Sequence, residues 1–223
     1  MSPSRIVQQS LDVGLDLIAI CDHNTVENAE VAMREGQKLG VHVLPGMEVC
    51  SKEEVHILAL FEEIDSARNM QSYVYANLPG ANKPEVFGCQ VVANENDEVL
   101  GENPRLLIGA TQLGLHDIVD KTHALGGLSL SCHVDRPAYG IINQLGFIPA
   151  DLPLDGVEVS RHVKLANARR SIAGIENFSC ITNSDAHFLE DIGQVHTVFQ
   201  MAEPTIAEIR KSLLQQEGRR ILV

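Results

Sequence analysis

Short apolar runs alternate with amphipathic segments along most of this 223-residue chain. Leu17–Cys21, His56–Phe61 and Leu128–Cys132 have the length and composition of buried strands, and segments of helical periodicity separate most such runs. Regular alternation of strand and helix is typical of a mostly parallel sheet covered by helices. The sequence therefore predicts an α/β fold with a barrel-like sheet.

The expected elements fit one domain spanning residues 1–223, since this length suffices to bury a sizeable core. Helices are expected at about 4–13, 25–39, 65–76, 115–125, 165–173 and 204–215, and strands at 17–21, 41–49, 56–61, 128–132, 156–160, 178–182 and 195–200. Prolines, glycines and asparagines interrupt the alternation of strand and helix from about 78 to 110, which predicts an elaborated insertion with a short hairpin around Asn96.

Amino-acid composition limits what this protein can bind and where in the cell it is expected. The formal net charge of −13 argues against a surface that binds duplex nucleic acid, because phosphates are held by excess Lys and Arg. A small anionic substrate stays compatible, since bound metal reverses the local field. No apolar run is long enough to span a bilayer, and the five cysteines form no Cys-x-x-Cys pair. We expect a cytoplasmic protein without a membrane partner; composition does not give the oligomeric state.

Histidines and carboxylates cluster where apolar runs end. In a β/α barrel, the carboxyl ends of the strands meet at one face and carry the chemistry, so groups distant in sequence converge there. Imidazole and carboxylate groups converging in a cleft form a site for divalent transition metals. The clusters are Cys21-Asp22-His23-Asn24, Gly46-Met47-Glu48, Cys132-His133-Val134-Asp135-Arg136 and Asn183-Ser184-Asp185-Ala186-His187, with His56 at the head of a further run.

Each cluster also has a structural interpretation. Asp185 and His187 point the same way in extended backbone, but the segment also suits a solvated turn. Only one of Asp22 and His23 should reach a metal, because neighbouring side chains of a strand face opposite ways. Glu48 could form a salt bridge, and a lone histidine such as His56 is more often a core residue.

Other residues carry weaker signals. Arg136 and Arg161 could meet an anionic substrate, although a surface salt bridge is the simpler role for Arg161. The chain has no Gly-x-Ser-x-Gly elbow, phosphate-binding Lys-Ser/Thr loop or Gly-x-Gly-x-x-Gly motif. The histidines expected to be structural or solvent-facing are His42, His116, His123, His162 and His196.

In this order, the motifs resemble the PHP family, named for polymerase and histidinol-phosphatase domains. The resemblance covers nearly the whole chain except 78–110, and it implies a distorted seven-stranded β/α (TIM-like) barrel with two or three divalent ions, such as Zn, Mn or Fe. It implies that Glu48 bridges two ions, and that the metal ligands are His23, Glu48, His56, His133, Asp185 and His187.

One motif of the family has no counterpart. Members open with a strand that ends in His-x-His, whereas no histidine precedes His23 here and the sequence starts at the helix that would follow that strand. We therefore expect a shortened or degenerate member that lacks the first strand and holds fewer ions.

The resemblance implies a metal-dependent phosphoesterase that hydrolyses a small phosphorylated metabolite or nucleotide through a metal-activated water. We assign His133, Asp185 and Arg136 to catalysis, with Arg136 holding a non-reacting phosphoryl oxygen. Two alternatives stay open: an amidohydrolase-like metal hydrolase of a non-phosphate substrate, and a metal-binding domain with impaired catalysis.

Overall fold

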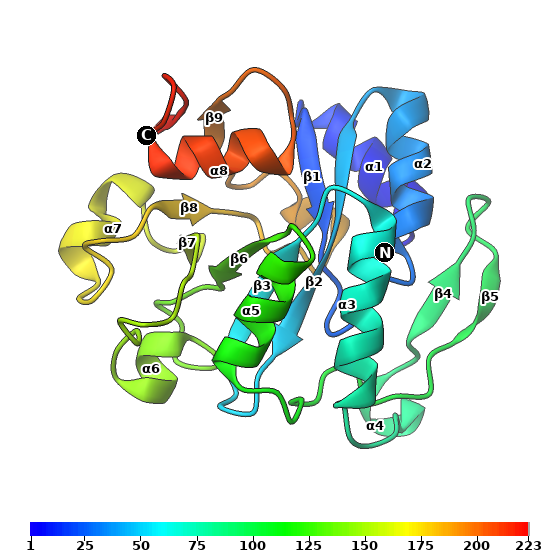
Figure 1. Cartoon of the computed structure of the whole chain (residues 1–223). Coiled ribbons are helices and arrows are strands. Elements are labelled where there is room, and N and C mark those ends of the chain that lie inside the picture. The colour runs from blue at the N-terminus through cyan, green and yellow to red at the C-terminus, as the bar shows by residue number, and fades with distance from the viewer. Residues whose placement is uncertain (223) are drawn as a thin grey trace.

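A six-stranded sheet forms the centre of the computed structural model, which describes residues 1–222 (Figure 1). Its strands lie in the order β1-β2-β3-β6-β7-β8. Their bounds are Leu17–Ile20 for β1, His42–Cys50 for β2, His56–Leu60 for β3, Leu128–Ser131 for β6, Gly156–Val159 for β7 and Cys180–Thr182 for β8. The α/β class predicted from the alternating pattern is confirmed.

The direction of β3 differs from that of the other five strands. Pairs β1–β2, β6–β7 and β7–β8 are parallel, whereas β3 runs antiparallel to both β2 and β6. The connection from β2 to β3 contains only 51–55, which is too short for the crossover that a parallel pair needs. The first residue of β3 therefore lies at the same edge as the last residues of its neighbours.

The expected seven-stranded barrel is not confirmed. The sheet contains six strands in the described residues, and the strand expected near 195–200 does not join it. That segment forms β9 (Val198–Gln200), which pairs antiparallel with β10 (Arg220–Leu222) in a separate two-stranded sheet. The sheet is curled into a half-barrel (Figure 1).

Apolar side chains pack on both faces of the sheet. In β3, Ile57 and Ala59 join the larger apolar cluster, whereas Leu58 and Leu60 point into a second cluster with Ile209 and Leu213 of helix α8 (Ile206–Leu214). This division follows from the two-residue period of a strand. The sheet is thus buried on both faces.

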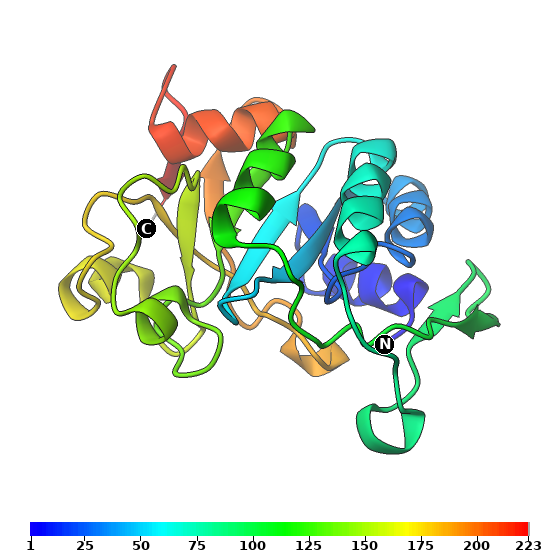
Figure 2. The same cartoon turned by 60° about the horizontal axis from the view of Figure 1, so that its bottom comes forward.

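The remaining helices lie around the sheet and in its connections (Figure 2). They are α1 (Pro3–Asp12), α2 (Ala29–Leu39), α3 (Ile64–Ala76), α4 (Pro84–Phe87), α5 (Leu115–Ala124), α6 (Ile141–Leu145) and α7 (Leu165–Ser171), together with the short 3-10 helix η1 (Leu189–Asp191). Among residues 1–222, no helix combines the length and apolar character that crossing a bilayer would require.

The insertion contains the hairpin expected around Asn96. Strands β4 (Val91–Ala93) and β5 (Val99–Glu102) pair antiparallel and, with α4, extend from the body of the molecule (Figure 2). The side chain of Asn28 donates to the carbonyl of Val91 and accepts from the N–H of Ala93. Asn28 thus connects the hairpin to the segment before α2, and α2 starts at Ala29 instead of near Thr25.

Candidate metal centre

The polar clusters of the sequence meet at one edge of the sheet. His23 follows β1, Glu48 lies near the end of β2, and His133 follows β6. His56 is the first residue of β3, and the reversed direction of this strand brings it to the same edge, opposite Cys50.

Backbone pairing continues past β1 and fixes His23 beside Glu48. The two residues form an isolated parallel bridge, in which the N–H of Glu48 donates to Asp22 O at 3.1 Å and the N–H of Asn24 donates to Glu48 O at 2.9 Å. Asn24 then turns the chain with φ of 53°. The position of His23 is therefore set by the sheet.

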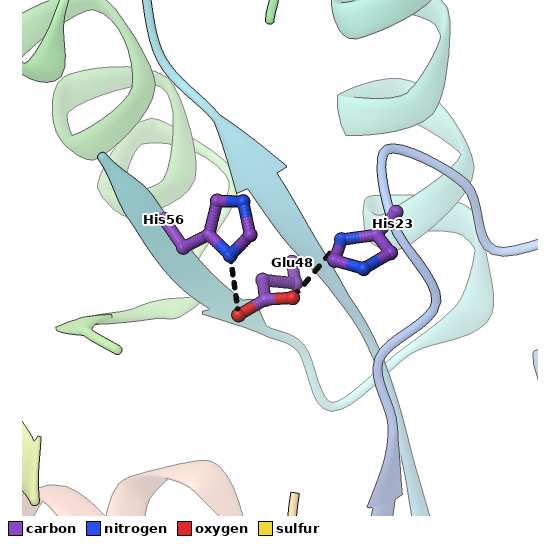
Figure 3. Close-up of side chains that lie close together, drawn as sticks. All are labelled: His23, Glu48 and His56. Carbon is purple, nitrogen blue, oxygen red and sulfur yellow. Dashed lines mark ion pairs between the residues drawn. The ribbon is translucent and has the colours of Figure 1, made fainter. Parts of the chain in front are cut away.

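Three imidazoles surround the Glu48 carboxylate. His23 Nδ1 lies 3.0 Å from Oε2, while His56 Nδ1 and His133 Nε2 lie 3.0 and 3.3 Å from Oε1. His56 and His133 are buried, and His23 is half-buried. Figure 3 shows His23 and His56 directed at the two oxygens of Glu48 from opposite sides.

The contacts in this cluster fit a divalent cation. Nδ1 of His56 is buried without a hydrogen-bond partner although Glu48 Oε1 is 3.0 Å away, so its angle does not suit a hydrogen bond. Ligand atoms about 2.0–2.2 Å from a shared ion lie roughly 3 Å apart, as these do. His23, Glu48 and His56 each offer an atom within 4.8 Å of the others. Nitrogen and carboxylate donors suit Zn, Mn and Fe.

The Glu48 carboxylate is charged although it is buried away from solvent. Burial alone would raise the pKa of its carboxyl, but His133, His23 and His56 hold this pKa well below the usual range. Burial opposes protonation of His23, yet the contact with Glu48 raises the pKa of this imidazole. The cluster thus keeps an anionic carboxylate at its centre.

Asp185 and Arg136 form a second group in the same pocket. Arg136 Nη2 lies 2.7 Å from Asp185 Oδ2, which is buried and has no hydrogen bond of suitable geometry. The pocket has a volume of about 470 Å³, and His23, Glu48, His56, His133, Arg136, Asp185 and His187 are among its lining residues. This volume suits a small-molecule ligand.

His187 lies at the margin of the site. Its side chain is 63% exposed, and Nδ1 lies 3.0 Å from the backbone carbonyl of Asp185 but 3.9 Å from the Asp185 carboxylate. The structure therefore brings His23, Glu48, His56 and His133 into contact, places Asp185 beside Arg136, and leaves His187 turned toward solvent. The complete ligand set stays a prediction.

Sequence reasoning missed two residues of this region, Tyr139 and Glu158. Tyr139 lines the pocket and stacks on His56. Glu158 lies in β7 and is only 5% exposed; burial, and then the charges of Asp185 and Glu48, raise its pKa to about 8. A carboxylate between Val157 and Val159 in an expected strand was the available signal for Glu158.

Comparisons with known proteins point to the same family as the sequence motifs. Residues 167–217 match the model of a PHP-associated family. The lesion-specific endonuclease Q of Pyrococcus furiosus shares the fold with a TM-score of 0.70 and 19% identity, over 100% of this chain and 53% of its own. A protein described as a metal-dependent phosphoesterase from Bifidobacterium adolescentis gives a TM-score of 0.53 and 17% identity, over 84% of this chain and 82% of its own.

The chain spans only part of some of these relatives. A 5′-3′ exoribonuclease of Haemophilus influenzae is 27% identical over 63 residues, which is 27% of this chain and 23% of the exoribonuclease. The chain also spans about half the length of endonuclease Q.

One finding corrects the expectation that excluded duplex nucleic acid. Endonuclease Q in complex with a 27-mer duplex bearing an abasic lesion at the active site matches with a TM-score of 0.69 and 20% identity, over 99% of this chain and 53% of its own. This fold therefore occurs in a protein that binds duplex DNA. The net charge of −13 is a sum over the whole chain, whereas phosphate binding depends on the local field, which bound cations would reverse.

The match of the carboxyl-terminal segment and the shared fold confirm the resemblance to the PHP family that the motifs predicted.

Proposed function

We propose that this chain, acting as one domain over residues 1–223, is a metal-dependent phosphoesterase. The observation that carries the proposal is the arrangement of three imidazoles around the buried Glu48 carboxylate, in a pocket that also contains Arg136 and Asp185. Such a pocket combines donors for divalent cations with a guanidinium for a phosphoryl group.

The proposed substrate is a phosphoester of a nucleotide or of a nucleic-acid strand. The supporting relatives are an endonuclease and an exoribonuclease by name, and both names denote cleavage of phosphodiester bonds. A small phosphorylated metabolite would fit the same pocket. We favour the nucleotide class because the names of these two relatives refer to nucleic acid.

His23, Glu48, His56 and His133 would hold the ions, with Asp185 as a further ligand. Divalent ions bound there supply acidification of the attacking water and neutralisation of charge on the phosphoryl oxygens. Glu48 offers one oxygen to His23 and the other to His56 and His133, which matches the bridging role proposed for it. The proposed ions are Zn, Mn or Fe. The number of ions bound depends on how many of these side chains coordinate a metal.

Arg136 would bind and orient the substrate. A guanidinium has five N–H donors, so the ion pair with Asp185 leaves donors for a non-reacting phosphoryl oxygen. Asp185 lies beside this guanidinium, with Oδ2 2.7 Å from Arg136 Nη2, and His133 lies in the same pocket with Nε2 3.3 Å from Glu48 Oε1. We assign His133, Asp185 and Arg136 to the reaction on these grounds.

Glu48→Gln tests the proposal with bis(p-nitrophenyl) phosphate and Mn²⁺ as the assay. The amide keeps the shape of the side chain but removes its charge, so we expect hydrolysis to fall by at least about 100-fold, a few kcal/mol of lost electrostatic stabilisation. Glu85→Gln is the matched control, because Glu85 is an exposed glutamate in α4 that is absent from the pocket lining.

The outcome separates the candidate functions. Equal phosphodiester hydrolysis by Glu48→Gln and wild type would contradict the proposal. Turnover of amide substrates without turnover of phosphate esters would favour an amidohydrolase-like enzyme, and metal binding without either activity would favour a domain with impaired catalysis.

A further inference from the structure

The lining of the metal pocket includes an uncharged segment. Pro137, Ala138 and Tyr139 line the pocket together with Arg136 and the polar residues of the metal cluster. Tyr139 is 37% exposed even though it contacts the buried His56. The pocket therefore has a polar part and an apolar aromatic part.

The Tyr139 ring has one occupied face. It lies parallel to the His56 imidazole, with ring centroids 4.3 Å apart and an angle of 13° between the planes. Tyr139 is also partly exposed and is among the residues that line the pocket. Because His56 covers one face of the phenol ring, the other face is the one on which a planar ligand would stack.

The backbone holds this ring in a fixed place. Tyr139 has φ of 60°, a left-handed conformation that is rare and unfavourable for a bulky residue. Its carbonyl accepts a hydrogen bond from the His56 N–H at 3.0 Å. A Cβ on Gly140 would lie 2.5 Å from Arg136 O, so the turn after Tyr139 requires glycine. A strained backbone held by such contacts is characteristic of ligand sites.

We propose that Tyr139 is a stacking subsite for the nucleobase of the substrate. Aromatic rings stack on every base because each base has a π-face, whereas Arg136 and the metal ligands suit the adjoining phosphate. A pocket of about 470 Å³ accommodates both parts of a nucleotide. This inference rests on the proposed function and deepens it, since it names the part of the substrate that the phosphoester chemistry does not touch.

Calorimetric titration with the non-hydrolysable 5′-phosphonate analogue of thymidine monophosphate and with methylphosphonate tests the subsite without turnover. Wild type should bind the nucleotide analogue more tightly than methylphosphonate. Tyr139→Leu should reduce this preference about 5- to 150-fold, the range for loss of one stacked base. Tyr139→Phe keeps the ring and should keep the preference.

Two controls separate stacking from general damage. Phe87→Leu removes an exposed aromatic ring of α4 outside the pocket and should leave the preference unchanged. Circular dichroism and thermal unfolding check that each variant is folded. An equal loss of affinity for both ligands in Tyr139→Leu would mean that the ring only supports His56, which overturns the proposal.

A wild type without preference for the nucleotide would also overturn it. A different result would show that the phosphoesterase assignment is wrong. If wild type does not hydrolyse bis(p-nitrophenyl) phosphate, that assignment fails, whereas the titrations still test the stacking subsite.

Discussion

Glu158 should make the stability of the metal-free protein depend on pH in a direction unusual for a carboxylate. Its pKa is raised from 4.5 to about 8 because it is buried in β7 and because Asp185 and Glu48 are nearby carboxylates. Between these two values the folded state keeps a proton that the unfolded chain has lost. The free energy of unfolding therefore decreases as the pH rises through this window.

The size of the effect follows from the two pKa values. Protonated Glu158 contributes fully below about pH 4.5, and the contribution is lost as the pH approaches 8. Between pH 5 and pH 8 the linkage relation gives a loss of roughly 3.5 kcal/mol, which is an upper value for a single group. Glu158→Gln removes this titration while keeping a neutral side chain of the same shape.

Urea unfolding in the presence of a chelator measures the difference. The chelator matters because a bound cation would favour the charged carboxylate and lower its pKa. We expect Glu158→Gln to be more stable than wild type at pH 8, and the difference between the two proteins to shrink toward pH 5. Parallel stability curves for the two proteins over this range would show that Glu158 does not retain a proton in the folded state.

Two further substitutions test how the site is supported. Asn24→Gly tolerates the φ of 53° but removes the hydrogen bonds that the side chain donates to Leu107 O and Gly109 O and accepts from the Cys50 N–H, so we expect a loss of about 2–3 kcal/mol in urea unfolding and faster proteolysis within 78–110. An unchanged cleavage rate would show that these bonds do not anchor the insertion. Gly140→Ala pushes a Cβ against Arg136 O, and we expect thermal unfolding to report about 1–3 kcal/mol of destabilisation; wild-type stability would mean that the turn adapts.

Apolar runs of the sequence predicted the six central strands well. Strands such as β3 and β6 are buried on both faces, so their hydrophobic residues are continuous and easy to recognise. The last expected strand was assigned to the wrong sheet. Val198 and Gln200 are exposed, and β9 pairs with β10, a partner that local sequence did not reveal.

The candidate site was predictable where a ligand follows a strand directly. His23 and His133 extend β1 and β6, and Glu48 lies within β2, so the strand pattern places all three. His56 lies at the same edge because β3 is reversed, which periodicity does not indicate. Tyr139 could not be found from sequence, since its position depends on a left-handed turn and on stacking with a residue 83 positions earlier.

Metal content is the most direct test of the central claim that His23, Glu48, His56 and His133 form a divalent metal site. Elemental analysis should compare wild type, Glu48→Gln and the control Glu85→Gln after purification without chelators. We expect at least one tightly bound ion per chain in wild type and in the control, and a loss of this metal in Glu48→Gln, because the wild-type carboxylate contacts all three imidazoles. Equal metal content in all three proteins, or no metal in wild type, would show that these four residues do not form the expected metal site.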